Sequence, residues 1–393
     1  MALKNIGTCI VDMEIICDKR NCTGCGLCVS NCPKHCISME IGELRHLYPH
    51  INQDKCIDCG LCKKSCPSLH DIRCSYPAAA YAAWSKDEND YESSTSGGMA
   101  SVLTNYVLSN GGVVYGCTVL PSIKIRHVRI DNIDEAYRLK GSKYVQSSIV
   151  DALRQIRKDI KDGRHVLFIG TPCQVAAVKQ MYKEQPENLY LVDIICHGVP
   201  SNEWLKEYIT KDLKIDKTKV SSVSFRQKNA YRLCIFKDED LIYQSKKLWT
   251  HHGDDLYLAS FMDAFTSRES CYNCHYAKPE RISDITIGDF WGLGKEKDDA
   301  DIPAHPYGIS CALPITEKGK DLILAVNDNL NIYERPVTEA INGNDQLKAP
   351  KKENLRIKIF RKIYGKIGIE AAYKLCNLDK IFKHSIKNMI IKK

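Results

Sequence analysis

One run of twelve residues in this chain reads Cys22-Thr-Gly-Cys25-Gly-Leu-Cys28-Val-Ser-Asn-Cys32-Pro33. A second run, 34 positions later, reads Cys56-Ile-Asp-Cys59-Gly-Leu-Cys62-Lys-Lys-Ser-Cys66-Pro67. Both follow the pattern C-x2-C-x2-C-x3-C-P. An internal repeat of this kind indicates two copies of one structural unit, each able to present four thiolates from a short loop.

This cysteine spacing is the one that bacterial ferredoxins use for two 4Fe-4S clusters. In that arrangement the first three cysteines of a run hold one cluster and the fourth holds the other cluster. We therefore expect one cluster on Cys22, Cys25, Cys28 and Cys66, and a second on Cys56, Cys59, Cys62 and Cys32. The alternative is zinc, which CxxC pairs also bind, but two full runs that each end in Cys-Pro favour iron–sulfur clusters and one-electron transfer.

Length and composition describe a globular protein of about two to three domains, with 393 residues of which 44% are apolar. The sequence contains no apolar run of membrane-spanning length and no signal-peptide pattern. Twenty cysteines would suggest disulfides in a secreted protein. Ferredoxin-type runs instead predict a reducing cytoplasm, where thiolates stay available to iron.

The net charge of +8 comes from one end of the chain. Residues 351–393 carry 13 Lys and Arg against three acids, so the rest of the chain has a net charge of −2. The body therefore gives no argument for nucleic-acid binding. The tail alternates basic and apolar residues, and two interpretations stand. Either it docks as an amphipathic helix on a partner or an anionic membrane surface, or it packs on its own domain with a solvated basic face.

The segment 165–201 alternates buried strands with helices. Residues 165–169 and 189–195 read as strands, and Pro172 and Ser201 suit the beginnings of the helices that follow them. A β-α-β-α order predicts parallel strands, and ligands bind at the carboxyl ends of such strands. Cys173 and Cys196 both lie at that edge, so we expect them to face the same crevice.

Several segments together resemble the coenzyme F-420 hydrogenase/dehydrogenase beta-subunit family. They are Ser96-Gly-Gly98, Gly141-Ser-Lys-Tyr144, Gly170-Thr-Pro-Cys-Gln174, Cys196-His-Gly-Val-Pro-Ser201, Ser224-Phe-Arg226, Cys271-x-x-Cys274 and Asp284-Ile-Thr-Ile-Gly-Asp-Phe-Trp-Gly292. They occur in the family's order from the ferredoxin unit to about residue 335. The resemblance implies an electron-transfer module that contains FAD. Archaeal relatives pass electrons between iron–sulfur clusters and a deazaflavin, but the family also occurs in bacteria without that deazaflavin.

The resemblance also implies flavin contacts. Backbone N–H groups of the Ser-Gly-Gly segment precede a helix, where phosphate binds well, and Lys143 can offset phosphate charge. The expected cofactor-binding residues are Ser96, Gly97, Gly98, Ser142, Lys143, Gly170 and Thr171. His197 adjoins Cys196 and is a candidate proton shuttle; the alternative is a histidine that only hydrogen-bonds to the backbone.

The same family match favours a third 4Fe-4S cluster. Its expected ligands are Cys173, Cys196, Cys271 and Cys274, because a CxxC loop supplies two thiolates and the strand ends supply two more. The alternative is buried free cysteine, the usual state of this residue. Eight further cysteines at positions 9, 17, 36, 74, 117, 234, 311 and 376 have no ligand spacing and read as core or surface thiols.

The expected fold is α+β: a two-cluster ferredoxin-like domain (residues 15–75) fused to an α/β flavin domain with a partly parallel sheet. That domain has an N-terminal part (78–165) and a C-terminal part (166–335), followed by the basic tail (350–393). We expect a flavin-dependent iron–sulfur oxidoreductase that exchanges electrons with a redox partner protein or a small electron carrier. The alternative is a flavin-free relay or scaffold subunit of a larger redox complex.

Overall fold

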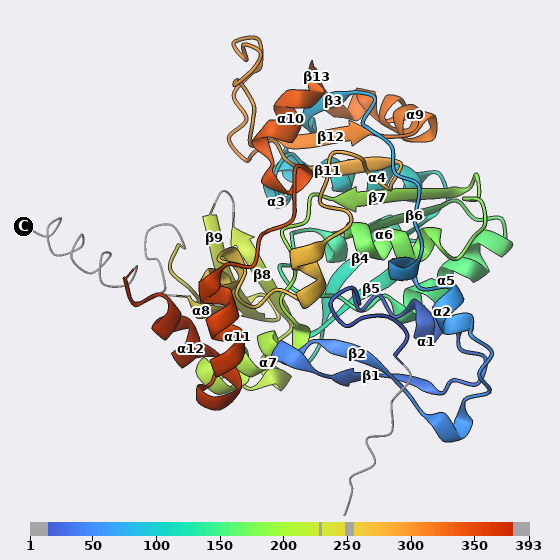
Figure 1. Cartoon of the computed structure of the whole chain (residues 1–393). Helices are drawn as coiled ribbons and strands as arrows, with labels where there is room; N and C mark the ends of the chain where they lie inside the picture. Colours follow the sequence, from blue (N-terminus) through green and yellow to red (C-terminus); the bar gives the residue numbers. More distant parts are fainter. Residues whose placement is uncertain (1–14, 228–229, 248–254, 380–393) are drawn as a thin grey trace, which may run out of the picture.

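The computed structural model describes residues 15–227, 230–247 and 255–379, which form three sheets and their covering helices (Figure 1). In those ranges the strands are β1 (Ile37–Ile41), β2 (Leu47–Ile51), β3 (Ala80–Ser85), β4 (Val113–Leu120), β5 (Lys124–Ile130), β6 (Val166–Gly170), β7 (Leu189–Ile194), β8 (Ser222–Gln227), β9 (Ala230–Lys237), β10 (Asp240–Gln244), β11 (Ile285–Asp289), β12 (Ser310–Pro314) and β13 (Leu330–Arg335). The α-helices are α1 (Leu27–Asn31), α2 (Leu61–Lys64), α3 (Glu88–Ser93), α4 (Met99–Ser109), α5 (Val150–Lys161), α6 (Pro172–Lys179), α7 (Asn202–Glu207), α8 (Leu256–Met262), α9 (Glu317–Ala325), α10 (Val337–Gly343), α11 (Leu355–Ile367) and α12 (Ile369–Cys376).

The central sheet has eight strands in the order β13-β3-β12-β11-β7-β6-β4-β5. The adjacent strands β4, β6, β7 and β11 are parallel, and the other four are antiparallel to their neighbours. The α+β class and the partly parallel sheet are therefore confirmed, and β6 and β7 are the two predicted parallel strands.

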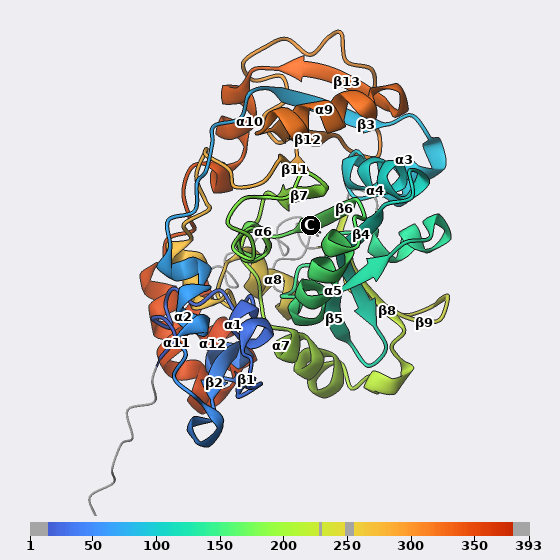
Figure 2. The same cartoon turned by 90° about the vertical axis from the view of Figure 1, so that its right-hand side faces the viewer.

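Alternation along the parallel strands gives the sheet two buried faces. Tyr115 and Phe168 pack with α5 and α6 on one face, whereas Val114 and Leu167 pack with α4 and α9 on the other. Figure 2 shows the two helical layers on either side of the strands. The carboxyl ends of β6, β7 and β11 are left free of covering helices, and the candidate site lies there.

A second core surrounds the small antiparallel sheet β10-β9-β8. Helices α7, α8, α11 and α12 contribute to it, and Ile357 and Phe360 of the tail are completely buried there. The described part of the tail thus packs on its own domain, as one of the two interpretations expected. Contact with a partner or a membrane stays a prediction, and residues 380–393 lie outside the described ranges.

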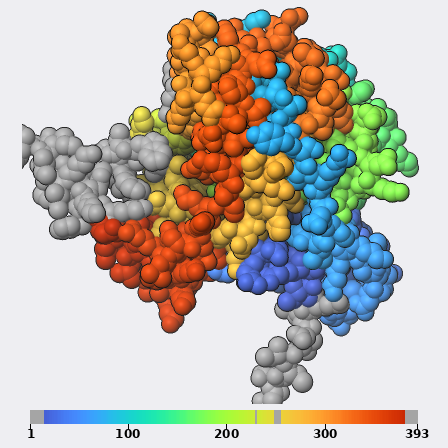
Figure 3. Space-filling model, turned by 45° about the horizontal axis from the view of Figure 1, so that its top comes forward, coloured from blue at the N-terminus to red at the C-terminus, as the bar shows by residue number. Residues whose placement is uncertain are grey.

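The ferredoxin unit (residues 15–75) consists of the hairpin β1-β2 with α1 and α2. Figure 3 shows this blue unit and the red helices α11 and α12 at one end of the molecule. Helix α1 contacts α5, and the turn between β1 and β2 reaches the second core through the buried side chain of Leu44. The unit is therefore docked on the body at two points.

Arg268 holds the ferredoxin unit to the body from inside the interface. Its side chain is among the largest that are fully buried, with 1% of the residue exposed. Nε donates to the carbonyl of Cys22 (2.6 Å), Nη2 donates to the carbonyl of Leu47 (2.9 Å), and Nη1 donates to Oε1 of Gln146 (3.3 Å). The guanidinium also stacks over the ring of Tyr48, 4.2 Å from its centroid. One side chain from the body thus donates hydrogen bonds to carbonyls in two separate segments of the ferredoxin unit.

Gln146 and His46 extend this junction. The Gln146 amide donates to the carbonyl of Thr23 (3.0 Å), and His46 contacts Gln146 through Nδ1 (3.2 Å) and the carbonyl of Thr266 through Nε2 (3.2 Å). Burial lowers the pKa of His46 to about 3, so the ring is neutral at physiological pH. The interface is therefore a polar network whose members have buried partners on both sides.

Replacing Arg268 by Met should loosen the ferredoxin unit without removing apolar volume. Buried acceptors that lose their donor cost about 1–3 kcal/mol each, so two lost carbonyl contacts should raise the open population at least about tenfold. Limited proteolysis in the exposed segment 69–71, near the end of the ferredoxin unit, measures this opening.

Arg45→Met is the matched control. Arg45 crosses the same interface to Glu207 (3.1 Å), but its side chain is 48% exposed, and an exposed ion pair contributes about 0–1 kcal/mol. Equal cleavage rates in the two variants would show that Arg268 does not hold the interface.

Candidate functional site

The eight cysteines of the ferredoxin unit surround two pockets. The proximal pocket is lined by Cys22, Cys25, Cys28 and Cys66. The distal pocket is lined by Cys32, Cys56, Cys59 and Cys62. The fourth cysteine of each run thus lies with the first three of the other run, which is the grouping that the sequence predicts. Left-handed Gly26 and Gly60 begin α1 and α2 and turn each loop around its pocket.

Each of these pockets has a fifth cysteine that spacing did not predict. Cys17 lines the proximal pocket and Cys36 the distal one, where its sulfur lies 3.3 Å from that of Cys32. The hydrogen bond from Cys17, helped by the charge of Arg268, lowers the pKa of Cys22. Cys17 and Cys36 stand outside the repeated spacing, so the pattern itself offers no signal for them. Cys9 lies outside the described residues.

A third, inner pocket is lined by Cys173, Cys196, Cys271 and Cys274, the four thiols that the sequence places together. Cys173 lies in the first turn of α6, which has a capping box between Thr171 and Gln174. Cys196 follows β7, so parallel pairing of β6 and β7 brings both thiols to one edge. Cys74, which spacing did not single out, also lines this pocket.

Arg281 anchors the loop that carries Cys271 and Cys274. Its Nη1 donates to the carbonyl of Tyr276 (2.6 Å), and its Nη2 donates to the fully buried carboxylate of Asp193 in β7 (2.7 Å). The CxxC loop is therefore tied to β7, the strand that precedes Cys196. This tie is the physical reason why thiols about 75 positions apart in the chain meet, which strand periodicity alone does not reveal.

Burial dominates the protonation of the inner thiols. It raises the pKa of Cys173 to about 12 and that of Cys271 to about 11, and it raises the pKa of Cys196 and Cys274 as well. Because metals bind thiolates, loading this pocket must release protons. In the described part of the chain, no three His, Cys, Asp or Glu side chains converge closely enough to hold one ion. The thiols surround pockets instead.

The pockets are contiguous. Thr23, Pro67 and Ser68 line both the proximal and the inner pocket. Cys25 and Cys173 pack against the same apolar cluster, which includes Tyr276, so the ferredoxin unit and the inner pocket share apolar contacts. The proximal and distal pockets are also adjacent, because cysteines of both pack in one apolar cluster with Ile16 and Ile37.

Beyond the inner pocket lies a cavity of about 270 Å³ at the carboxyl ends of β6, β7 and β11. Of the residues expected to contact a cofactor, Ser96, Gly98, Ser142, Lys143, Gly170 and Thr171 line it, and so does His197. Gly97 is the exception, because it lies behind the wall and its N–H donates to Ser310 Oγ (3.0 Å). Its missing side chain serves packing, since a Cβ there would meet the carbonyl of Ala83 at 2.1 Å.

Several groups at one end of the cavity suit an anion. Helix α4 begins there, after Gly98 in the left-handed conformation, and its first N–H groups face the cavity. The hydroxyl of Ser94 is buried there without a hydrogen-bond partner. The hydroxyl of Thr95 accepts from the N–H of Ser142 (3.1 Å), which fixes the two loops together.

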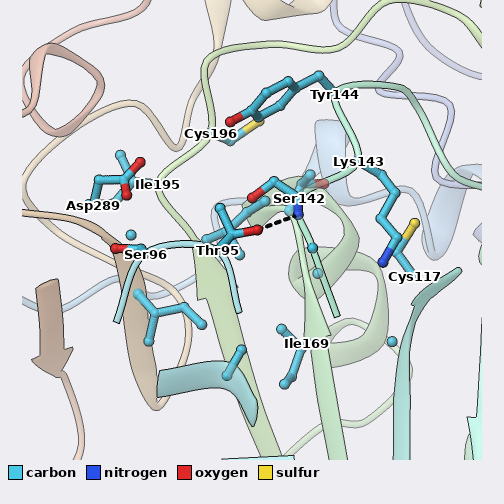
Figure 4. Close-up of a pocket in the computed structure, with 18 of the residues that line it drawn as sticks. Thr95, Ser96, Cys117, Ser142, Lys143, Tyr144, Ile169, Ile195, Cys196 and Asp289 are labelled. Atoms are coloured by element: carbon cyan, nitrogen blue, oxygen red, sulfur yellow. Dashed lines mark hydrogen bonds between the residues drawn. The ribbon is translucent and has the colours of Figure 1, made fainter. Parts of the chain in front are cut away.

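Lys143 brings a cation to the wall of the same cavity. Its ammonium donates to the carbonyls of Leu139 (3.0 Å) and Lys140 (2.6 Å), and Figure 4 shows it extending toward Cys117. Burial lowers the pKa of Lys143 to about 8. Both acceptors are carbonyls, and among the described residues no carboxylate pairs with this ammonium, so an anionic ligand would supply the missing charge partner.

The opposite wall brings together residues from three of the family-like segments. Nη1 of Arg226 donates to both carboxylate oxygens of Asp289 (2.9 and 3.0 Å), and the guanidinium lies over the ring of Tyr231, 5.3 Å from its centroid. Tyr144 stacks on Phe261 beside them. Sequence analysis singled out these segments but not the Arg226–Asp289 pair. Trp291, 49% exposed, lies at the cavity rim.

One short segment separates the cavity from the inner pocket. Thr171, Cys196, His197 and Val199 line both spaces. His197 is exposed at this boundary, where its imidazole can reach either side. The three cysteine pockets and the cavity therefore form one succession from the ferredoxin unit to the sheet edge. Among the described residues, no helix is long and apolar enough to cross a membrane.

Comparison with known proteins covers most of the chain. Residues 80–154 match the family model "Coenzyme F420 hydrogenase/dehydrogenase, beta subunit N-term", and residues 163–340 match the model of its C terminus. Residues 21–69 match a 4Fe-4S dicluster domain. No curated protein matches the chain.

One solved structure that aligns with the chain is described as "Xenon derivatization of the F420-reducing [NiFe] hydrogenase complex from Methanosarcina barkeri". Its chain is 17% identical, with a TM-score of 0.46, and the alignment covers 70% of this chain and 93% of that one. The assignment rests on the family models, which match both halves of the α/β domain in order. The chain belongs to the coenzyme F420 hydrogenase/dehydrogenase beta-subunit family, with a 4Fe-4S dicluster domain at its N-terminal side.

Proposed function

We propose that this iron–sulfur oxidoreductase carries three 4Fe-4S clusters and FAD, and that it passes electrons between the clusters and a two-electron substrate or carrier. The succession of three cysteine-lined pockets that ends at the cavity is the observation that carries the proposal. The dicluster match supports the first two clusters.

The inner pocket fits a third cluster by its donor set. Four thiols from three segments line it, as a cubane requires, and they are placed by strand pairing and by Arg281 rather than by a flexible loop. The four cysteines are half-buried, which limits the access of solvent to a cluster. Ordinary core cysteines have no reason to gather in a group of four between two redox domains.

The cavity fits FAD by its polar groups. The beginning of α4, the unpartnered Ser94 hydroxyl and the Lys143 ammonium all suit a diphosphate, while Tyr144, Phe261 and Ile169 offer apolar walls for a ring system. The alternative function, a flavin-free relay subunit, leaves these anion-binding groups without a purpose. The flavin content of protein purified anaerobically distinguishes the two functions.

Bound FAD would exchange electrons singly with clusters and in pairs, as hydride, with a substrate. The chain's own residues would then position the substrate and supply or accept a proton. His197 lies where the inner pocket meets the cavity and can hold or move a proton there. The Arg226–Asp289 pair fixes the far wall against which a substrate would lie. The family name suggests a deazaflavin as that substrate, and another two-electron carrier fits the same chemistry.

We place this chemistry in the cytoplasm, where reducing conditions keep thiolates available. We also propose that each domain holds its own set of cofactors. Residues 15–75 would hold two clusters, and residues 78–165 and 166–335 share one sheet that would hold the third cluster and the flavin.

Replacing Cys271 and Cys274 together by Ser should lower iron from about twelve to about eight atoms per chain, for three cubanes against two. The spectroscopic signals of the two ferredoxin clusters should persist, and reduction of the flavin through the clusters should fail. Metal analysis and low-temperature EPR of anaerobic protein measure both effects.

Cys234→Ser/Cys311→Ser is the matched control, because both thiols are fully buried outside the pockets. It should keep about twelve iron atoms. Unchanged iron in the Cys271/Cys274 variant would remove the inner pocket from the list of cluster sites.

FAD affinity should fall as the pH rises through about 8. Burial lowers the pKa of Lys143 to about 8, so the free protein presents a cation below that pH and a neutral amine above it. A diphosphate favours the cation, so affinity should be level below about pH 7 and drop by up to about tenfold per pH unit above 8. Fluorescence titration of the flavin-depleted protein measures this dependence.

Lys143→Met should bind FAD more weakly and should lose the pH dependence. Lys140→Met is the comparison, because Lys140 lines the same cavity but already pairs with Asp90 (2.5 Å). Its variant should keep the wild-type pH dependence. A pH dependence that survives in Lys143→Met would assign it to another group.

A further inference from the structure

The two halves of the ferredoxin repeat meet different surroundings. Leu27 of the first half is completely buried against the α/β domain, whereas Leu61, its equivalent 34 positions later, is 43% exposed. A Cβ on Gly26 would meet Val150 of α5 at 2.4 Å, but one on Gly60 would meet nothing within 4 Å. Figure 2 shows α1 lying between α2 and the body. Equivalent positions of the repeat therefore contact the α/β domain in the first half and face solvent or open space in the second half.

The contact of the first half with the α/β domain is the place where an electron would pass from the ferredoxin unit to the inner pocket. Cys25 lies in the apolar cluster that also contains Cys173 of the inner pocket, so this face of the first half is the one turned toward the next redox site. The equivalent thiol of the second half, Cys59, is exposed to solvent. The repeat therefore presents outward, around the distal pocket, the same surface that it uses inward to contact an electron acceptor.

The exposed copy of this surface has an apolar centre and a basic rim. Ile57 and Leu61 flank Cys59, and they are 57% and 43% exposed. The loops around the distal pocket, residues 33–36 and 53–64, carry four lysines against two aspartates, in a body whose overall charge is −2. Lys34, Lys55 and Lys64 are exposed. Exposed apolar residues beside a redox centre, with an excess of one sign of charge around them, are features of a docking site.

We infer that this face, formed by Ile57, Leu61 and the surrounding lysines, docks a small acidic protein that carries one electron. The inference rests on the proposed function, in which Cys32, Cys56, Cys59 and Cys62 hold the distal cluster. One electron leaves the reduced carrier, which becomes oxidised, and the distal cluster accepts it; no bond or proton is transferred. The lysines attract the acidic partner over long range, and the two apolar side chains give the short contact that electron transfer needs.

The test measures the rate at which a reduced plant-type 2Fe–2S ferredoxin, an acidic carrier, reduces the clusters in stopped flow. In wild-type holoprotein the rate constant should fall as ionic strength rises. Lys55→Glu/Lys64→Glu changes the net charge of these loops from +2 to −2, so it should lower the rate constant by about tenfold or more at low ionic strength and should reverse its salt dependence. Ile57→Ser/Leu61→Ser should lower the rate at all ionic strengths.

Two controls separate docking from loss of the cluster. Lys217→Glu/Lys219→Glu makes the same charge change on exposed lysines of another surface and should leave the rate within about twofold, as expected for charges remote from the docking face. Reduced methyl viologen, a small cation that needs no docking face, should reduce Lys55→Glu/Lys64→Glu at least as fast as wild type.

The outcomes are distinct. Missing iron at the distal pocket in wild-type protein would overturn the proposed function itself. Full iron with ferredoxin rates that are equal in Lys55→Glu/Lys64→Glu and in Lys217→Glu/Lys219→Glu would overturn only the docking inference. A wild-type dimer that dissociates in Ile57→Ser/Leu61→Ser would assign this face to a second copy of the chain, and would also overturn it.

Discussion

The buried guanidinium of Arg268 is the constraint on which the arrangement of the redox sites depends. A buried cation is costly unless its donors are satisfied, and here the acceptors are two ferredoxin carbonyls, the Gln146 amide and the sulfur of Cys22 at 3.5 Å. The charge is therefore oriented toward the proximal pocket rather than toward a carboxylate. Gly24 shows how close the contact is, since a Cβ on it would lie 2.8 Å from the guanidinium. The ferredoxin loop and the body can fit only in this one register.

The C-terminal helices complete the same junction. Arg361 donates to Glu43 (2.8 Å) and to the carbonyl of Ser267 (3.1 Å), and the Tyr364 hydroxyl accepts from the N–H of Leu44 (3.0 Å). These contacts join the turn of the ferredoxin hairpin to the residues just before Arg268. Part of the tail's basic charge is thus used inside the protein. A charge count cannot distinguish such a buried arginine from one on a solvated face.

The sequence predicted features that depend on local chemistry. The cysteine runs, the helix after Ser96-Gly-Gly98, the helix beginnings at Pro172 and Ser201 and the parallel pair β6–β7 all carry short-range signals, and the structure has them. It could not predict that β3 pairs with β12 and β13, because no local pattern specifies partners more than 200 residues away. For the same reason the sequence did not predict the roles of Arg268, Gln146 and the additional pocket cysteines Cys17, Cys36 and Cys74. Their roles come from what the fold places beside them.

The parallel strands explain why one sheet edge can serve two kinds of group. The strands β6 and β7 end side by side, so the residues after β6 and those after β7 face both the inner pocket and the cavity. Cys196 and His197 are consecutive on this boundary, so a thiol of the inner pocket lies next to an imidazole that also lines the cavity. A two-electron reduction of an organic substrate needs electrons and a proton at one place. The end of β7 brings these two side chains to the edge because Cys196 and His197 follow closely on the strand that pairs with β6 and β11.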